Sequence, residues 1–586
     1  MPAFREETIL TRRHMLRMMA LSVGAVAMGG ALVACGGDDD DTDAGSSTPD
    51  AGTSTTPVGT AAMGASTSAT TDASPTTSTS GSGSGMGAGM SSGEIVIAAP
   101  GDRHAPDSSL PNIGMTIPNP SIYETLVALT PDFNVEPRLA ESWENIGDNT
   151  WRFHLREGVT FHDGRPFTAE AVAWTMARVA AAGGRNMLIG EDSVQIVDDL
   201  TVDITPMEQN VMLPLQLTSP RDGSIIAPND VNTDVRNGTG PFREVEYTKD
   251  EQHIVEAFAD YWGGAPGLQK MTFRYMPDPT TRLLALQAGE VDLIFDVPRE
   301  AVATITGMND TELVTSAVGA YSSLSFNIHG ASPYELGQDP LIREAVGMAI
   351  DRDAIINGGW QGYAEVNNTM VPPGVLRDAA SLVEGPTFDP ERAAQMLDEG
   401  GWVLDGDVRA KDGCELRLTM IVGYPSAEIH RPMPELVQAQ LKDIGIAIDI
   451  VQTPDSGSYG ARLESLEGDL WAEVGNQVDA DPAYLPAALY SSPIEGADAG
   501  DNAYANAFAP GAAFDAKIAE VRSAATIEEA QIAAAEAMKI MIDEEHIVIP
   551  IAGIIRLYGV NSRVQNFTPH PVQFVERWES VTVSAG

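Results

Sequence analysis

Short apolar runs alternate with amphipathic stretches along most of the chain. Five runs, rich in β-branched and aromatic residues, predict strands: "WRFHL" (151–155), "MTFRYM" (271–276), "VDLIF" (291–295), "ELRLTMIV" (415–422) and "IAIDIVQ" (446–452). Amphipathic segments of helical period lie between them. Interleaved helices and strands are typical of α/β lobes rather than of a helical bundle or a β-sandwich.

Three segments carry the signals of a helix start. They are "DPTTRLLALQAGE" (278–290), "DPLIREAVGMAIDRDAI" (339–355) and "DPERAAQMLDEGG" (389–401). Asp is a favoured N-cap, and Pro is favoured at the first helical position. Glycine is favoured just beyond the last turn, so Gly289 and Gly400 are expected to end the first and the third helix.

The N-terminus has a different pattern, with an arginine-rich head followed by a weakly apolar run at 18–34. This layout predicts a secretory signal peptide over residues 1–34, because the run is too short and too rich in glycine to be a permanent membrane span. Arg12 and Arg13 resemble a twin-arginine export signal. "LVAC" resembles a bacterial lipobox, so Cys35 is expected to be lipidated after cleavage.

A region of low complexity, 35–93, follows the signal. It consists almost wholly of Ser, Thr, Gly, Ala, Asp and Pro, and it begins with "CGGDDDD". Such a composition cannot bury enough apolar surface to offset the entropy of ordering, so it predicts a flexible stalk. Together with a lipid on Cys35, the stalk would hold a folded part that starts near Glu94 on the outer face of the cytoplasmic membrane.

The chain is strongly acidic, with 83 Asp and Glu against 35 Lys and Arg and a net charge of −48. A charge of this sign, without any local basic patch, argues against binding to nucleic acid or to an anionic lipid surface. Only six of the basic residues are lysine. The acidity is explained equally by a GC-rich genome with a solubilising surface and by life in high salt.

An ordered series of motifs identifies the chain with a known family. The segment "LAESWENIGDNTWRFHLREGVTFHDGRPFTAEAVAWTM" (139–176) reads as a hairpin, a Gly/Pro turn and a helix capped by Thr168. "NGTGPF" (237–242), the Asp-Pro segment at 389–401 and "IVIPIAG" (547–553) follow in order. The series resembles the family-5 solute-binding proteins of ABC importers, which carry peptides, nickel complexes and opines.

The resemblance implies an α/β, two-lobed periplasmic-binding-protein fold of class II with an extra subdomain in the first lobe. Lobe I would comprise 94–327 and 550–586, and lobe II 328–549, with crossings near Asn327 and Ile549. It also implies a monomer without a cofactor that binds its ligand between the lobes. The loaded form would then dock on the permease subunits of an importer.

The nickel-binding branch of the family is one source of expected site residues. There, two arginines hold the carboxylates of a metal chelate, and they appear at Arg185 and Arg221 of this sequence. The histidine that completes the metal shell in that branch is not found, because the corresponding position is Ala472. Imidazole is a preferred nickel ligand, so its loss weakens the nickel interpretation and no metal ligand is assigned.

The peptide-binding branch is the other source. "VGNQVDADPAYLP" (474–486) resembles its segment in which an aspartate takes the ammonium of the peptide N-terminus, and Asp479 fits that position. Tyr459 and Trp471 are expected to line the ligand pocket, although aromatic residues at such positions also form cores. The sequence therefore favours capture of a small peptide or related zwitterion, with a metal chelate held by Arg185 and Arg221 as the alternative.

The other candidate class is an enzyme, in the form of an exported and tethered hydrolase. The sequence has no H-E-x-x-H, no G-x-S-x-G and no phosphate loop that ends in Gly-Lys. Carboxylates are too common in this chain for a pair of them to be informative. We therefore expect binding rather than catalysis.

Overall fold

The structure is a computed structural model of the 586-residue chain. It describes residues 93–101, 119–181, 189–190, 192–220, 223–228, 236–423, 433–477, 479–493, 503–572 and 575–584. The predicted signal peptide with Arg12 and Arg13, the lipidation site Cys35 and the predicted stalk lie outside these residues.

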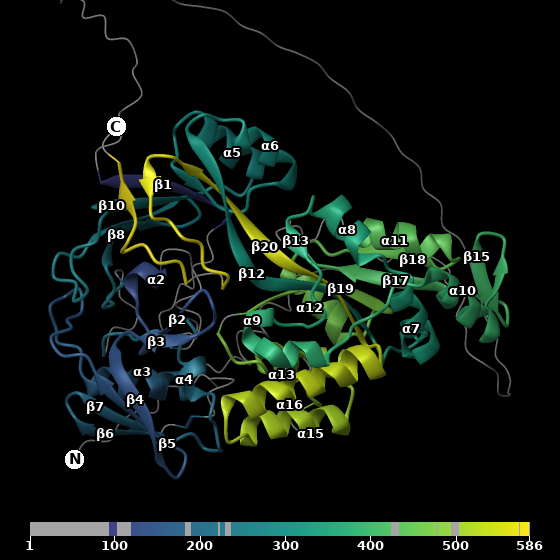
Figure 1. The fold of residues 1–586 in the computed structure, drawn as a ribbon, viewed down its shortest axis with the longest axis horizontal. Helices are drawn as coiled ribbons and strands as arrows, with labels where there is room; N and C mark the ends of the chain where they lie inside the picture. Colours follow the sequence, from purple (N-terminus) through teal and green to yellow (C-terminus); the bar gives the residue numbers. More distant parts are fainter. Residues whose placement is uncertain are drawn as a thin grey trace, which may run out of the picture. The chain divides into compact units, whose positions relative to one another are not determined.

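An 11-stranded sheet organises the described residues, in the order β18-β17-β19-β12-β20-β11-β1-β10-β9-β8, with β13 paired to β20 (Figure 1). The strands are β1 (Glu94–Ala99), β8 (Phe242–Thr248), β9 (Gln252–Ala257), β10 (Lys270–Tyr275), β11 (Leu293–Ile294), β12 (Thr311–Phe326), β13 (Ala364–Glu365), β17 (Arg417–Val422), β18 (Ala447–Gln452), β19 (Leu470–Asn476) and β20 (Val548–Asn561). β1 runs parallel to β10 and β11, and β17 runs parallel to β18 and β19.

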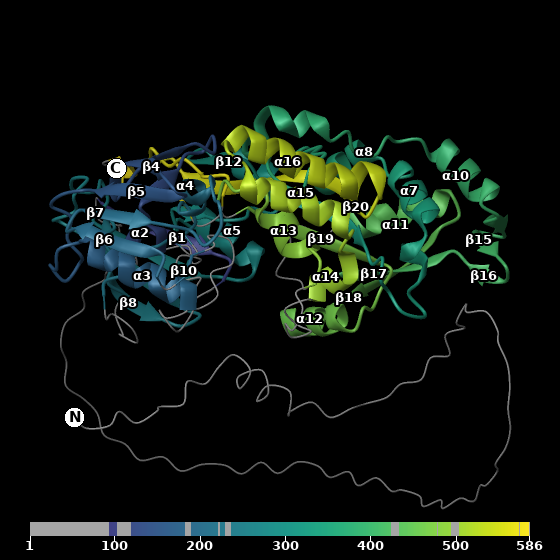
Figure 2. The same cartoon turned by 90° about the horizontal axis from the view of Figure 1, so that it is seen from below.

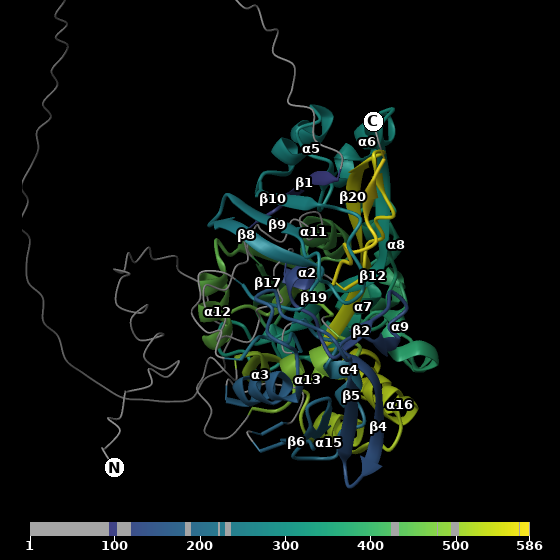
Figure 3. The same cartoon turned by 90° about the vertical axis from the view of Figure 1, so that its left-hand side faces the viewer.

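Two long strands join the two parts of this sheet. β12 and β20 pair antiparallel from Thr311 opposite Asn561 to Ser325 opposite Val548, and they run side by side in Figure 3. β12 continues the pairing to β19, whereas β20 continues it to β11. The expected lobe crossings near Asn327 and Ile549 fall at the end of β12 and the start of β20, and the lobe boundaries stay a prediction.

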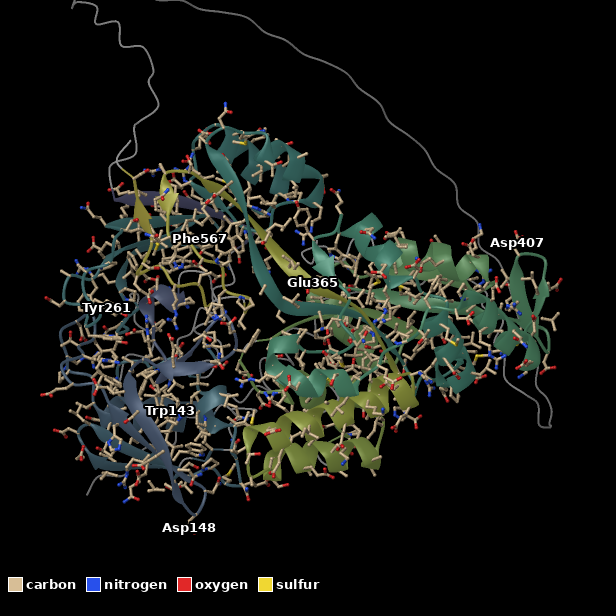
Figure 4. The ribbon with its side chains drawn as sticks, in the orientation of Figure 1. Trp143, Asp148, Tyr261, Glu365, Asp407 and Phe567 are labelled. Atoms are coloured by element: carbon tan, nitrogen blue, oxygen red, sulfur yellow. The ribbon has the colours of Figure 1, made fainter. Side chains whose placement is uncertain are left out.

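Four smaller sheets surround the central one. They are a four-stranded sheet of β4 (Ala140–Gly147), β5 (Thr150–Leu155), β7 (Thr201–Ile204) and β6 (Val194–Asp198), a three-stranded sheet of β14 (Val403–Asp405), β15 (Val408–Lys411) and β16 (Cys414–Glu415), and the pairs β2 (Val127–Leu129) with β3 (Val135–Pro137) and β21 (Val564–Gln565) with β22 (Thr582–Val583). The predicted hairpin is confirmed by β4 and β5. Its turn contains Asp148 with φ +49°, which is labelled in Figure 4.

The α-helices pack mainly against the faces of the sheets. They are α2 (Asn119–Ile122), α3 (Ala169–Ala181), α4 (Leu213–Gln216), α5 (Pro279–Gln287), α6 (Val302–Thr306), α7 (Pro340–Met348), α8 (Arg352–Gly359), α9 (Pro373–Leu376), α10 (Pro390–Glu399), α11 (Met433–Asp443), α12 (Ser456–Glu464), α13 (Tyr484–Tyr490), α14 (Ala503–Phe508), α15 (Ala512–Ser523) and α16 (Ile527–Lys539). α15 and α16 lie side by side (Figure 2). Across the described ranges, no helix combines the length and the apolar character needed to cross a membrane.

The part of the sheet around β12 and β19 is buried on both faces, because the side chains of each strand point alternately to its two faces and helices cover both. Ala320, Leu324 and Ala472 face a core that includes residues of α7, α8 and α11. Tyr321 and Trp471 face a second core built with α13, α14 and α16. This second core also contains residues of β2 and α4, so it extends across the predicted boundary between the lobes.

The sequence signals for α5 are confirmed. Asp278 caps the helix, because its side chain accepts a hydrogen bond from the Thr281 N–H at 2.6 Å. Gly289, with φ +69°, follows the C-cap, where a left-handed conformation costs glycine little.

The end of α10 differs from the prediction by one residue. Asp389 caps the start and accepts from the Arg392 N–H at 2.9 Å, as expected. Gly400 was expected beyond the end, but it is the C-cap and keeps a right-handed conformation at φ −77°. Gly401 instead takes the left-handed position at φ +86°, because the C-cap lies one residue further along the chain than expected.

The predicted strands also need two corrections. The runs at 151–155, 271–276 and 446–452 each form one strand, with bounds within one residue of the prediction. The run at 291–295 is reduced to β11, and the run at 415–422 is divided into β16 and β17. The division falls at a change of sheet, which alternation alone does not reveal.

Candidate functional site

β19 leads directly into the segment that carries Asp479. The strand lies between β17 and β12, so its side chains point alternately to the two buried faces. Trp471, Glu473 and Gly475 share the face covered by α13 and α14. A Cβ atom at Gly475 would lie 1.9 Å from Cε1 of Tyr321, so only glycine fits beneath that ring.

Trp471 and Tyr459 lie together in an aromatic core. Trp471 is fully buried, and its ring meets those of Tyr459 and Phe508 edge to face, with centroids 4.9 and 6.2 Å away. Its indole N–H donates to the carbonyl of Glu467 at 3.0 Å. The structure thus brings both predicted aromatic residues together, and their contact with a ligand stays a prediction.

A buried carboxylate, Glu473, lies beside this aromatic core. It accepts hydrogen bonds from the hydroxyls of Ser325 at 2.7 Å, Tyr490 at 3.2 Å and Tyr459 at 3.4 Å. Burial raises the pKa of Glu473, and the hydroxyl donors only partly oppose this effect. No sequence motif marks Glu473 as a functional residue.

Asp479 and Asp481, which we call the acidic segment, follow the end of β19. Asp479 is 2% exposed, and its Oδ1 accepts from the Asp481 N–H at 2.9 Å. Asp481 accepts from the Ala483 N–H at 2.9 Å and from the side-chain amide of Gln216 at 2.7 Å. Burial raises the pKa of Asp481, against the effect of these donors.

The contact from Gln216 connects the two predicted lobes. Gln216 lies at the end of α4, and its Oε1 accepts from the Asn210 amide at 2.8 Å. Nearby, Gln209 donates to the carbonyl of Ala524 at 3.1 Å. The acidic segment therefore lies where residues of predicted lobe I reach predicted lobe II.

Arg556 makes a second connection, at the last residue of β19. Its Nη2 donates to Oδ1 of Asn476 at 2.6 Å, and its Nη1 lies 3.5 Å from Oδ1 of Asp296. Asp296 follows β11 and has φ +52°, an uncommon conformation for a residue with a side chain. Arg299 follows closely, and its Nη2 donates to the carbonyl of Ile555 at 2.7 Å.

The charges around Arg556 influence one another. Burial lowers the pKa of Arg299 to about 10, and the nearby Arg556 acts in the same direction while Asp296 opposes it. Burial also raises the pKa of Glu576 to about 7, although Arg556 and the hydroxyl of Tyr558, 3.3 Å from Oε1, favour its charged form. None of these residues was singled out from the sequence.

The two arginines expected to hold a chelate, Arg185 and Arg221, lie outside the described residues. In the parts of the chain that the structure describes, no three His, Cys, Asp or Glu side chains are grouped closely enough to hold a metal ion.

Comparison with solved structures defines the class of protein. The chain matches NikA from Brucella suis, solved in complex with Fe(III)-EDTA, with a TM-score of 0.73 and 25% identity over 84% of this chain and 100% of that one. The mixed α/β fold is thus that of the class II periplasmic binding proteins, as expected.

Sequence comparison then gives the family. Residues 134–496 match the bacterial extracellular solute-binding proteins, family 5 Middle, and this is more than half of the chain. The chain therefore belongs to the family 5 extracellular solute-binding proteins of ABC transporters. The expected family is thus confirmed. The family consists of binding proteins and not of enzymes, so the expectation of binding rather than catalysis is confirmed as well.

Two curated relatives are similar over 59% of this chain. The nickel-binding periplasmic protein of Escherichia coli K12 is 30% identical over 368 residues, which cover 68% of its length. The glutathione-binding protein GsiB of Salmonella typhi is 29% identical over 356 residues, which cover 66% of its length.

Proposed function

We propose that the chain captures a small peptide or related zwitterion between its two lobes and delivers it to the permease subunits of an ABC importer. The lobes are those of the sequence analysis, 94–327 with 550–586 and 328–549. Cys35 would carry the lipid that keeps the receptor at the outer face of the cytoplasmic membrane. A flexible stalk would then raise its effective concentration near the transporter.

One observation carries this proposal, namely the position of the acidic segment where the two predicted lobes meet. The hydrogen bond between Gln216 and Asp481 spans 265 residues of sequence and joins α4 to the end of β19. Binding proteins of this type take their ligand between lobes that move about a hinge. Asp479 lies two residues before Asp481, and its carboxylate can pair with a ligand ammonium that becomes buried when the lobes close.

The relatives support a charged, chelating or peptide-like ligand without choosing among them. GsiB is named for glutathione, a tripeptide with one ammonium and two carboxylates. The Escherichia coli relative is named for nickel, and the Brucella protein was solved with an iron chelate of a polycarboxylate. A metal chelate held by Arg185 and Arg221 is therefore the second candidate.

A thermal-shift panel on the full chain tests the proposal. The panel holds a random tripeptide library, glutathione, single amino acids, and Ni(II) with and without histidine or EDTA. A ligand at about 100 times its Kd raises the free energy of unfolding by about 2.7 kcal/mol, a shift that is easily measured. We expect a rise with peptides that is lost on N-acetylation. A rise with metal chelates alone would favour the second candidate, and no rise with any peptide would contradict the first.

A further inference from the structure

Two arginines share one carboxylate just beyond the end of β11. Arg299 and Arg556, which we call the arginine pair, both interact with Asp296. The carboxylates that act on the pair are Asp296, Glu300 beside Arg299, and Glu576, whose pKa of about 7 leaves it largely neutral in mildly acidic solution.

The pair occupies the place where open α/β sheets bind ligands. β11 of lobe I and β19 of lobe II both end here, and Arg556 links Asp296 beyond the first strand to Asn476 at the end of the second. Ligands of such sheets bind outside the carboxyl ends of the strands. The positive φ of Asp296 at the same point is the kind of local strain that clusters at binding sites.

Arg299 has a side-chain donor that its protein neighbours do not use. Its Nε is buried and has no acceptor among the described residues, while its Nη2 donates to the carbonyl of Ile555 at 2.7 Å. Arg299 and Asp296 as whole residues are only half-buried, so part of each stays exposed.

We propose that the arginine pair is a subsite for a carboxylate of the transported ligand. Guanidinium groups bind carboxylates with two parallel hydrogen bonds, and the half-buried Arg299 would supply them. The inference deepens the proposed function and rests on it. The carboxylate is either the C-terminus of a short peptide or one arm of a chelating polycarboxylate.

The spacing of the two charged sites suits a short zwitterion. Arg556 contacts Asn476, which precedes Asp479 by three residues. Three residues of fully extended chain span at most about 11 Å, so the main chain of Asn476 and that of Asp479 lie no further apart than this. A dipeptide or tripeptide with its ammonium at Asp479 therefore reaches the arginine pair with its C-terminus.

The test compares wild type, Arg299→Gln and a control, Arg392→Gln, whose exposed guanidinium lies on α10. The full chain is titrated by thermal shift with a tripeptide library, the same library with C-terminal amides, succinate and Ni(II)-EDTA. We expect the acids to act at concentrations about 10-fold or more below those of the amides, because one charge-assisted pair is lost. Arg299→Gln should remove this difference, and Arg392→Gln should keep it.

Each other outcome separates the two proposals. Succinate or Ni(II)-EDTA that stabilises wild type but not Arg299→Gln, with no effect of peptides, would retain the carboxylate subsite and reject the peptide. Acids and amides that act equally on wild type would overturn the subsite while peptide binding stands. If Arg299→Gln weakens the binding of the acids and of the amides by the same factor, Arg299 has only a structural role, and the subsite is again overturned. No shift with any probe would overturn both.

Discussion

The acidic segment and the arginine pair differ in how far solvent can reach them. Asp479 and Asp481 are nearly inaccessible, and an amide from α4 covers Asp481 directly. Arg299 and Asp296 remain half-buried although Arg556 beside them is covered. Asp481 is thus covered across the predicted lobe boundary, whereas part of Arg299 stays exposed. A zwitterion that bridges the two would gain its ammonium contact only through a movement of the lobes, which ties ligand recognition to closure.

The largest effect is expected from the acidic segment. Asp479→Asn should lower the affinity for a tripeptide by about 100-fold, because a buried ion pair that loses one charge leaves the other uncompensated. Calorimetric titration of the full chain measures the change, and Asp407→Asn in the exposed turn between β14 and β15 is the matched control (Figure 4). An unchanged affinity in Asp479→Asn would remove this residue from the site.

At the arginine pair, replacing an aspartate by asparagine should raise the ligand affinity rather than lower it. Asp296→Asn removes the protein carboxylate that competes for both guanidiniums. The affinity for acids with a free carboxylate should therefore rise by about fivefold, and that for amidated peptides should stay the same. A fall in affinity for acids would show that Asp296 positions the arginines rather than competing with the ligand.

A smaller effect links the arginine pair to pH. Glu576 is influenced by Arg556, Tyr558 and Asp296, and its folded-state pKa of about 7 lies above the ordinary value of 4.5. Its contribution to stability is complete below pH 4.5 and is lost as the pH rises through 7, since the buried group must then ionise. The same ionisation adds a competing negative charge beside Arg556.

Two measurements follow from this titration. The affinity for a tripeptide acid should fall about threefold between pH 6 and pH 8 in wild type, and Glu576→Gln should flatten the profile. Chemical denaturation should show that Glu576→Gln gains about 1–3 kcal/mol relative to wild type over the same range. If affinity and stability change with pH in the same way in wild type and in Glu576→Gln, Glu576 is not the titrating group.

The smallest effect is expected in the aromatic core. Tyr459→Phe removes a hydroxyl whose contact with Glu473 is long, at 3.4 Å, and leaves the ring packed on Trp471. The free energy of unfolding should change by less than about 1 kcal/mol. If Tyr459 lines the ligand site as well, the peptide affinity will fall by more than this loss of stability, and calorimetry separates the two cases.

Local chemistry made much of the fold predictable. Asp278 and Asp389 mark helix starts because their side chains satisfy backbone N–H groups a few residues away. The β4–β5 hairpin was predictable as well, and in its turn the side chain of Asn145 accepts from the Gly147 N–H at 2.9 Å. Gly400 was misplaced by one residue, because either glycine of a pair can take the left-handed position and the neighbouring contacts decide between them.

The candidate site was predictable only in part. Asp479 stands in a recognisable segment, so its sequence neighbours indicate it. Arg299 and Ile555 lie 256 residues apart and meet through the pairing of β20, which no local pattern encodes. The one available signal was the scarcity of basic residues, which makes an arginine four residues after a predicted strand worth attention.

The central claim is that one ligand is held at both ends, by Asp479 and by the arginine pair. Isothermal titration of the full chain with one tripeptide in four forms tests it most directly: free, N-acetylated, C-amidated and blocked at both ends. The account predicts that each single block weakens binding at least about 10-fold and that the double block abolishes it. Blocked forms that bind as tightly as the free tripeptide would contradict the account.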